Sequence, residues 1–361
     1  MKKVGIMSMQ RIVNYGSFLQ AYALKKTIES FNNEVVFIDY NFEQNIVKSN
    51  QKFIFLTKVK NNLNFIAYVN KKMISKKFRK KYNLEYLKIL GINNLKYNYD
   101  KAIDTLVIGS DEVFNCLQPY PVGYSRELFG KGYEDINLIS YAASFGHVTI
   151  EQLKHYKIDK EIGNMLKKFH KISVRDYNSY SIVKEISSIE PIINFDPVLI
   201  GDFEKEISEN PVNIKFEHYI VLYAYTGRLN KEEEKYIKKF AKKNRLKIIS
   251  LGFYQKIADK NIIVNPFEVL NFFKNADYVI TDTFHGTIFS VKMNTNFCTL
   301  VRKNNYNKLY FLLKELKQEE RMVNNIDDIE LLYHKKVNFK KSNNIIEKKA
   351  KESIQYLKKY V

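Results

Sequence analysis

The first 40 residues alternate a strand pattern with a helix pattern, and this alternation limits the chain to folds built on a parallel sheet. We predict a strand over residues 3–9, a loop over 10–17, an apolar-periodic helix over 18–30 and a second strand over 34–40. Two strands joined by a helix run parallel, because the helix carries the chain back to the edge where the first strand began. The opening segment therefore indicates an α/β fold.

The same alternation continues through most of the chain. Further buried strands are predicted at residues 105–109, 138–143, 171–174 and 192–195. An acidic, irregular stretch at 201–216 then interrupts the pattern, and we interpret it as a linker. The pattern restarts with strands at 219–225, 247–252, 278–281 and 297–301 and helices at 231–243 and 266–275.

This restart indicates a second domain, since 361 residues are many for one hydrophobic core. We predict two Rossmann-like domains that face each other across a cleft, at residues 1–205 and 206–343, with a donor site in the second. A final amphipathic helix at 344–361 has no strand after it, and we expect it to return to the first domain.

The charge of the chain is strongly basic, with 59 Lys and Arg against 39 Asp and Glu. Residues 48–101 contain 14 basic and two acidic side chains, interleaved with apolar ones such as Phe53, Met73 and Phe78. This pattern predicts a basic helical insertion in the first domain. The insertion has three interpretations: a solvated helical face, a patch for anionic membrane or phosphorylated glycan, or a nucleic-acid site. No nucleic-acid-binding motif occurs, so we expect no nucleic-acid partner.

Cysteine content and hydropathy exclude several classes of protein. Cys116 and Cys298 are far apart and lack metal-ligand spacing, so neither a disulfide framework nor a metal site is predicted. This use of cysteine favours a cytoplasmic location. No uncharged apolar window of about 18 residues occurs, so no membrane-spanning helix is expected.

Two ionisable side chains follow predicted strands in positions suited to bind anions. The apolar run 278–281 ends before Asp282, and Gly286 opens a second apolar run, so His285 lies between a strand and a helix. The amino end of that helix can hold an anion, although a core or capping histidine is the alternative. Arg175 ends the strand at 171–174 with a planar fork suited to phosphate or carboxylate, unless it pairs with a nearby acid.

Other strand ends carry neutral and acidic polar groups. Asn14 and Ser17 flank Gly16, which allows close approach of a ligand to the backbone, although a plain helix cap fits equally well. Ser110 and Asp111 follow the strand at 105–109 and suit sugar hydroxyls, which need paired donors and acceptors. An Asp helix cap is the structural alternative there.

Taken together, six ordered segments resemble the polysaccharide pyruvyl transferase family. They are residues 14–20, 109–115, 140–146, 173–175, the pair Asp196-Pro197, and 282–287, which reads Asp-Thr-Phe-His-Gly-Thr. The resemblance covers most of the chain and implies two Rossmann-like domains similar to GT-B glycosyltransferases. It also implies transfer of a pyruvyl group from phosphoenolpyruvate to a sugar of a cell-surface polysaccharide or its lipid-linked precursor, giving a ketal.

The resemblance also assigns roles to individual residues. His285 matches the general acid of the family, and Arg175 matches an arginine that helps to hold the donor anion. We expect further donor contacts from Thr283, Gly286, Thr287 and Arg302, and acceptor contacts from Asn14, Tyr15, Gly16, Ser110, Asp111 and Ser144. Phosphoenolpyruvate is the expected donor substrate, with no cofactor and no metal. Contact with the inner face of the membrane through 48–101 would bring the enzyme to lipid-linked acceptors.

Two positions depart from the family pattern. Relatives often carry Arg two positions before the His, where this chain has Thr283, and Phe114 replaces a Trp. Three other cations could take the place of the missing arginine: Lys292, Arg302 and Arg321. Two alternative functions stay open, a glycosyltransferase-like enzyme that uses a nucleotide-activated sugar and a non-catalytic glycan-binding protein.

Overall fold

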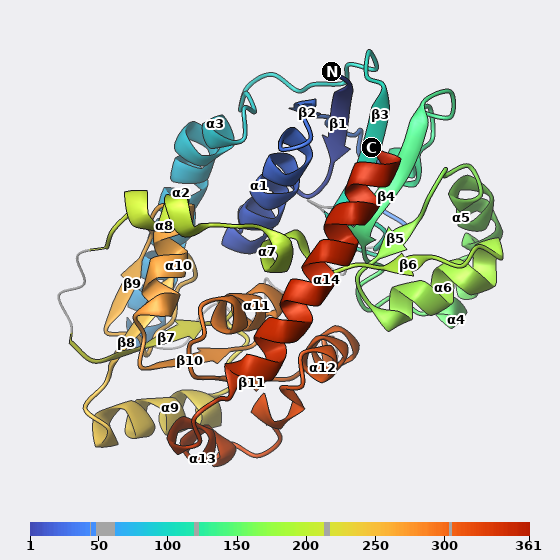
Figure 1. Ribbon diagram of the computed structural model, residues 1–361. Helices are drawn as coiled ribbons and strands as arrows, with labels where there is room; N and C mark the ends of the chain where they lie inside the picture. The colour runs from blue at the N-terminus through green and yellow to red at the C-terminus, as the bar shows by residue number, and fades with distance from the viewer. Residues whose placement is uncertain (44, 48–61, 119–122, 213–216, 303–304) are drawn as a thin grey trace.

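The computed structural model of the protein describes residues 1–43, 45–47, 62–118, 123–212, 217–302 and 305–361. Its strands form two six-stranded sheets, one in each half of the molecule (Figure 1). Every strand pairing within the two sheets is parallel. The α/β class and the two Rossmann-like domains predicted from the alternation are therefore confirmed.

The first sheet has the strand order β2-β1-β3-β4-β5-β6. Its strands are β1 (Lys3–Met7), β2 (Glu34–Phe37), β3 (Thr105–Asp111), β4 (Asn137–Ala143), β5 (Ser173–Val174) and β6 (Ile192–Ile193). Its helices are α1 (Tyr15–Glu29), α4 (Ile150–His155), α5 (Asp159–Leu166), α6 (Tyr177–Ser187) and α7 (Pro197–Ile200). Helix α1 begins earlier than the predicted residue 18, because the Asn14 side chain accepts a hydrogen bond from Gly16 N at 2.7 Å and caps the helix there.

The second sheet has the order β12-β11-β10-β7-β8-β9. Its strands are β7 (Tyr219–Tyr223), β8 (Lys247–Leu251), β9 (Lys260–Ile262), β10 (Tyr278–Thr281), β11 (Phe297–Leu300) and β12 (Met322–Val323). Its helices are α9 (Lys231–Lys243), α10 (Pro266–Lys274), α11 (Phe284–Lys292), α12 (Tyr306–Glu315) and α13 (Asp328–His334). Strand β10 and helix α9 have the predicted bounds. The short edge strands β9 and β12 were not predicted, since two or three residues show no period.

The connection between the sheets is partly helical rather than irregular. Helix α8 (Glu204–Glu209) occupies part of the predicted linker, and its first turn contains two acidic side chains that favour a helix amino end. The predicted domain boundary between residues 205 and 206 falls inside this helix and stays a prediction. Residues 213–216 of the linker lie outside the described residues.

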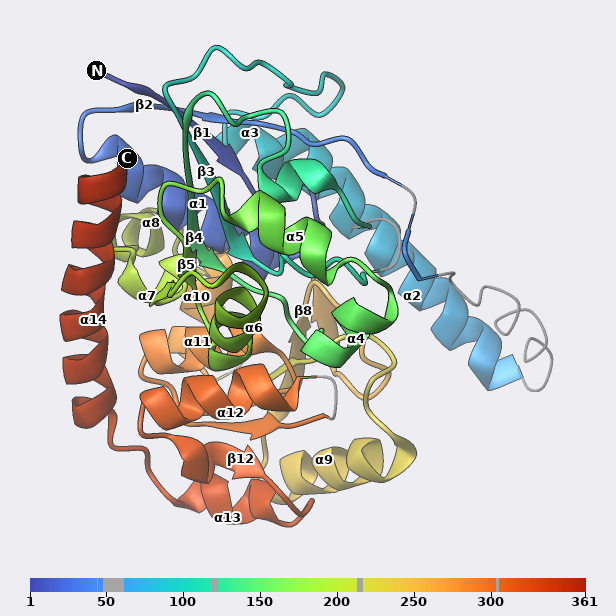
Figure 2. The same cartoon turned by 90° about the vertical axis from the view of Figure 1, so that its right-hand side faces the viewer.

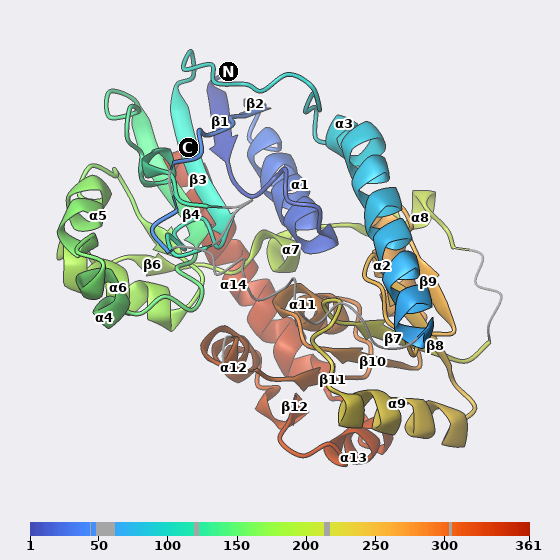
Figure 3. The same ribbon diagram turned by 180° about the vertical axis from the view of Figure 1, so that it is seen from behind.

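The basic insertion is helical where the structure describes it. Helix α2 (Asn62–Lys81) continues through a π-helical turn (Tyr82–Tyr86) into α3 (Leu87–Ile89), whereas residues 48–61 lie outside the described residues. Figure 3 shows α2 beside β8 and β9 of the second sheet. The ring of Phe78 in α2 lies 4.6 Å from that of Tyr15, and Tyr86 donates a hydrogen bond to the Val264 carbonyl. The insertion therefore connects the two halves.

The last helix, α14 (Phe339–Tyr360), runs along both halves of the molecule (Figure 2). Tyr356 in its last turns donates a hydrogen bond to the Ser140 carbonyl of β4 at 2.9 Å. Near its start, Ser342 accepts one from Gln318 in the second half at 2.8 Å. One hydrophobic cluster also extends across both halves, including the edge-to-face contact of Phe18 with Phe267 at 5.9 Å. Helix, insertion and shared core together hold the two sheets in one arrangement.

Among the described residues, no helix combines the length and apolar character that are needed to cross a membrane.

Candidate active site

A cavity of about 230 Å³ lies between the carboxyl ends of the two sheets. In each sheet the order of strand addition reverses once, between β1 and β3 and between β7 and β10. Such a reversal leaves a crevice, because the helices on its two sides leave toward opposite faces of the sheet. Both crevices contribute to the cavity, whose lining includes Met9, Ile12, Asn14, Ser17, Asp111, Glu112, Gln118, Arg175, Tyr225, Arg228, Asp282, Thr283, Phe284, His285, Asn305 and Lys308.

His285 lies in the first turn of α11 and packs against the start of α1. Thr283 is the helix cap, since its Oγ1 accepts a hydrogen bond from Gly286 N at 2.9 Å. The imidazole lies directly on Gly16, where an added Cβ would stand 2.3 Å from Cγ and Nδ1 of the ring. A side chain at position 16 would therefore displace His285, and this contact explains the glycine better than a backbone approach to a ligand does.

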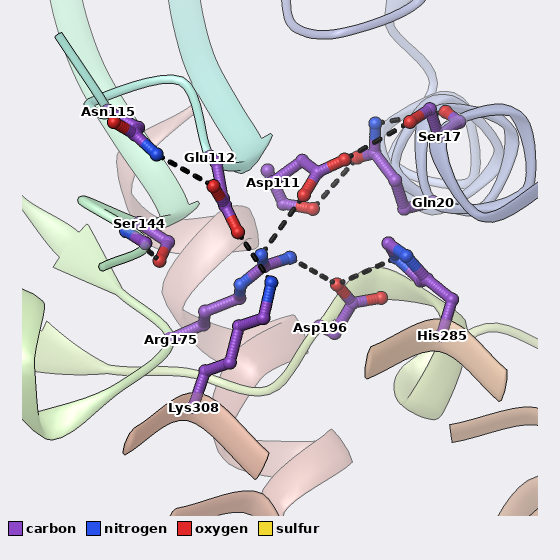
Figure 4. A network of polar contacts seen from close by, with 12 residues as sticks. Ser17, Gln20, Asp111, Glu112, Asn115, Ser144, Arg175, Asp196, His285 and Lys308 are labelled. Atoms are coloured by element: carbon purple, nitrogen blue, oxygen red, sulfur yellow. Dashed lines mark hydrogen bonds and ion pairs between the residues drawn. The ribbon is translucent and has the colours of Figure 1, made fainter. Parts of the chain in front are cut away.

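Asp196 connects His285 to Arg175 (Figure 4). Its Oδ2 lies 3.5 Å from His285 Nε2 and accepts a hydrogen bond from Arg175 Nη1 at 3.1 Å. Burial opposes the charge of this carboxylate, but His285 and Arg175 outweigh that effect and hold the pKa of Asp196 below its ordinary value. His285 Nε2 is buried and has no hydrogen-bond partner in the described part of the chain, and the Asp196 carboxylate lies beside it.

Arg175 is brought to the cavity, but its charge is already balanced by two carboxylates. Its Nη2 donates to Asp111 Oδ1 at 3.0 Å, in addition to the bond with Asp196. The guanidinium also lies over the ring of Phe284, 4.3 Å from its centroid. Only the Nε of Arg175 lacks a hydrogen-bond partner within the described ranges.

A second ion pair crosses the cavity from one half to the other. Lys308 in α12 lies 2.6 Å from Glu112, which follows β3. Burial alone would raise the pKa of Glu112, but Lys308, Arg175 and a hydrogen bond from Asn115 lower it to about 2. The sequence analysis missed Lys308, because a lysine on a helix among other lysines looks like part of a solvated face.

Arg228 is another lining residue that the sequence analysis missed. It follows β7 in a turn in which Gly227 has a φ of 82°, a conformation that favours glycine. Its Nη1 lies 4.0 Å from Oδ2 of Asp282, which is fully buried and whose pKa is raised mainly by that burial. No local pattern marked Arg228, since its place depends on the turn and on the neighbouring strand.

Several predicted site residues do line the cavity: Asn14, Asp111, Arg175, Thr283 and His285. Asn14 also joins the two halves, because its Nδ2 donates a hydrogen bond to the Tyr225 hydroxyl at 3.1 Å. Asp111 additionally accepts one from Ser17 Oγ at 3.2 Å. The structure thus collects residues from four strand ends at one place.

The remaining predicted acceptor residues do not line the cavity. Ser110 donates its hydroxyl to Gln20 Oε1 at 2.8 Å, and Ser144 donates its own to Asp176 Oδ2 at 2.6 Å. Tyr15 donates to the Val264 carbonyl at 2.9 Å. Ser110 lies within β3, Ser144 directly follows β4 and Tyr15 begins α1, and their hydrogen bonds lie inside the fold.

Among the predicted donor residues, Gly286, Thr287 and Arg302 are also used structurally. Thr287 Oγ1 donates to the Thr283 carbonyl at 3.0 Å, and Gly286 packs on Thr281, where a Cβ would meet Oγ1 at 2.2 Å. Arg302 forms a bidentate ion pair with Glu233.

The other two candidate cations lie elsewhere. Lys292 Nζ donates to the Leu199 carbonyl at 3.1 Å, and Arg321 donates to the Leu332 and Lys335 carbonyls. Neither they nor Arg302 lines the cavity. Within the described ranges, no group of three or more His, Cys, Asp or Glu side chains could hold a metal ion.

Comparison with known proteins identifies one matching family. Residues 14–304 match the family model described as polysaccharide pyruvyl transferase. No curated protein matches the chain. Similar solved structures include the S. aureus MnaA–UDP co-structure, with a TM-score of 0.49, 11% identity and coverage of 99% of this chain and 97% of that chain. The UDP-GlcNAc 2-epimerase from Methanocaldococcus jannaschii has a TM-score of 0.48 and 12% identity, with coverage of 96% of this chain and 99% of that chain. Arabidopsis thaliana UGT89C1 complexed with quercetin has a TM-score of 0.49 and 9% identity, with coverage of 99% of this chain and 98% of that chain.

The pair formed by Glu112 and Lys308 should make stability depend on acid pH. In the folded protein Glu112 stays ionised at pH values below its ordinary pKa of 4.5, because its folded pKa is about 2. The pair therefore stabilises the fold at neutral pH, and this contribution is lost as the pH falls from about 4.5 toward about 2. We predict that Glu112→Gln lowers the free energy of unfolding at neutral pH by about 1–3 kcal/mol. The difference from the unmodified protein should shrink progressively below about pH 4.

Urea unfolding at neutral pH and at about pH 3 measures this difference. Glu232→Gln, at an exposed position of α9, is the matched control and should change stability little at either pH. A difference for Glu112→Gln that stays constant with pH would contradict the assignment.

Proposed function

The chain belongs to the polysaccharide pyruvyl transferase family, and from this membership we propose that it transfers the pyruvyl group of phosphoenolpyruvate to a sugar of a cell-surface polysaccharide or of its lipid-linked precursor. The product would be a pyruvate ketal on two hydroxyl groups of the sugar. The observation that carries the proposal is the family match over residues 14–304. The chemistry of the cavity supports it.

Ketal formation needs an acid that protonates the methylene carbon of the donor. In the proposed reaction the His285 imidazole gives a proton to this carbon, and the adjacent carbon becomes an oxocarbenium-like centre. One sugar hydroxyl adds to that centre and its proton returns to His285. The bond from the same carbon to the phosphate oxygen then breaks, the second hydroxyl adds, and its proton leaves with inorganic phosphate.

The surroundings of His285 suit this acid role. Its Nε2 is buried at the cavity and has no hydrogen-bond partner among the described residues. The Asp196 carboxylate lies 3.5 Å from this nitrogen, and Arg175 donates a hydrogen bond to the same carboxylate oxygen and holds it in position. Arg175 lines the cavity, and its positive charge would contribute to donor binding. Asn14 and Asp111 are the lining groups that we propose for the acceptor hydroxyls.

We predict that the purified protein releases inorganic phosphate from phosphoenolpyruvate in the presence of a suitable glycoside or lipid-linked oligosaccharide. His285→Ala should slow this release by about 100- to 10,000-fold, the usual contribution of a general acid. The matched control is His155→Ala, since His155 is exposed on α4 and does not line the cavity. Phosphate release is followed in real time, and ketal formation by mass spectrometry of the glycan.

Other outcomes of the same assay would contradict the proposal. Turnover of a nucleotide-activated sugar, with no release from phosphoenolpyruvate, would indicate a glycosyltransferase-like enzyme. Glycan binding that survives His285→Ala, with no turnover of either donor, would indicate a non-catalytic binding protein. Unchanged phosphate release by His285→Ala would remove His285 from the mechanism.

The proposal includes peripheral contact with the inner face of the membrane, where lipid-linked acceptors would be located. Helix α2 buries Phe78 against the fold. The opposite side of α2 and the π-helical turn carries exposed basic and apolar side chains at spacings of three and four residues: Val69, Lys72, Met73, Lys76, Lys80 and Leu84. Such a face suits the headgroup region of an anionic bilayer, which attracts lysine and accepts apolar side chains.

We predict binding to vesicles that contain phosphatidylglycerol and much weaker binding to pure phosphatidylcholine vesicles. Changing Lys72, Lys76 and Lys80 together to Glu should weaken the first interaction by at least about 100-fold, since each lysine near an anionic surface contributes about 1 kcal/mol. The matched control changes the exposed Lys235, Lys238 and Lys239 of α9 to Glu, and it therefore alters the net charge of the protein by the same amount. Equal loss in both triple variants, or no binding by the unmodified protein, would contradict contact through α2.

A further inference from the structure

Three arginine or lysine side chains line the cavity, and two of them donate hydrogen bonds to carboxylates. Arg175 donates to Asp111 and Asp196, and Lys308 lies 2.6 Å from Glu112. The third is Arg228, and its side chain makes no hydrogen bond with the described residues. Its nearest carboxylate oxygen is Asp282 Oδ2, at 4.0 Å, which is beyond hydrogen-bond distance. Among the described residues, Arg228 is therefore the lining cation whose side chain makes no hydrogen bond.

The position of Arg228 is maintained from both domains. The turn that carries it is closed by the bond from Arg228 N to the Tyr225 carbonyl at 3.1 Å. The guanidinium lies over the Tyr225 ring, 4.3 Å from its centroid, while the hydroxyl of that tyrosine accepts a hydrogen bond from Asn14. Stacking on a ring face leaves the N–H groups at the edge of the guanidinium free to bind a ligand.

Asp282 orients the guanidinium without using its hydrogen-bond donors. Its Oδ1 accepts a hydrogen bond from Tyr225 N at 3.2 Å, which joins the ends of β7 and β10. Its buried Oδ2 has no hydrogen-bond partner in the described part of the chain and lies 4.0 Å from both Arg228 Nη1 and Arg302 Nε. Arg302 cannot serve the cavity in the same way, because Glu233 occupies its Nη groups.

Sheet geometry explains how Arg228 can replace the arginine expected at position 283. Strands β7 and β10 are neighbours, and Thr281 pairs with Tyr223 at their carboxyl ends. Side chains that follow these two strands therefore reach the same edge of the sheet. Thr283 caps α11 there, and the cation comes from the adjacent strand instead. The amino end of α11, at the same place, adds a partial positive charge.

The geometry points to Arg228 as the residue that binds the anionic phosphate or carboxylate of the donor. This inference rests on the proposed function for the identity of the donor, phosphoenolpyruvate. Phosphate and carboxylate are both oxyanions that a guanidinium can bind through two parallel hydrogen bonds. Lysine lacks this planar pair of donors and cannot form the same bidentate contact. Arg228 would then fix the donor beside His285, which acts on its methylene carbon.

Steady-state kinetics with Arg228→Gln and Arg228→Lys test the inference. We expect Arg228→Gln to raise the KM for phosphoenolpyruvate roughly 10- to 100-fold, with a smaller increase for Arg228→Lys and an unchanged KM for the glycan acceptor. Arg245→Gln is the matched control, since Arg245 is exposed and precedes β8 at the opposite edge of the sheet. An unchanged KM for phosphoenolpyruvate in Arg228→Gln, with unchanged melting temperature, would overturn the inference.

A binding measurement separates this inference from the proposed function. Isothermal titration calorimetry of the full-length protein with inorganic phosphate and with phosphoenolpyruvate should show binding. Arg228→Gln should weaken this binding roughly 10- to 100-fold, as expected for the KM. If the unmodified protein binds these anions through Arg228 but transfers no pyruvyl group, the anion site stands and the proposed function fails. If neither anion binds, or if Arg228→Gln binds them equally well, the role of Arg228 is overturned whatever the reaction.

Discussion

The buried carboxylate of Asp196 is the interaction on which the arrangement of the site depends. A carboxylate with so little exposure stays ionised only if neighbouring side chains offset the loss of water, and here those side chains come from both halves of the molecule. Arg175 belongs to the first sheet and His285 to the first helix after β10 in the second. Because one carboxylate serves both, the position of the imidazole is coupled to the end of β5. The close contact of the ring with Gly16 fixes the same position from the side of α1.

Most of the charge around the cavity is paired within the protein, and this pairing identifies the groups that are left for a ligand. Glu112 pairs with Lys308 from the other half of the molecule, whereas Asp111 pairs with Arg175 within the first sheet. The polar atoms that lie at the cavity without a hydrogen-bond partner among the described residues are few, and they include His285 Nε2, Arg175 Nε and Asp282 Oδ2. These atoms are buried, so the lining group that is left for an oxyanion beside His285 is the Arg228 side chain, which makes no hydrogen bond with the described residues. The proposed transfer from phosphoenolpyruvate would need such a cation.

The sequence predicted the features that depend on local pattern and missed those that depend on long-range pairing. Strand β10 and helix α9 had the expected bounds, because an apolar run and a strong helical period identify them without tertiary context. The place of His285 at a strand end followed from the same reasoning. Lys308 and Arg228 were missed, since their partners lie 196 and 54 residues away and no local period marks them. Ser110 and Ser144 were expected to bind the acceptor because they follow strands, but whether such a hydroxyl faces the cavity or the core depends on partners from other segments, here Gln20 and Asp176.

The most direct test of this account is a crystal structure of the protein with phosphoenolpyruvate bound. We expect an oxyanion of the donor to contact Arg228 at the amino end of α11, with the methylene carbon within reach of the His285 imidazole. The Asp196 carboxylate should remain beside the imidazole. Donor bound outside this cavity, or bound within it with the methylene carbon turned away from His285, would contradict the central claim that His285 protonates the donor.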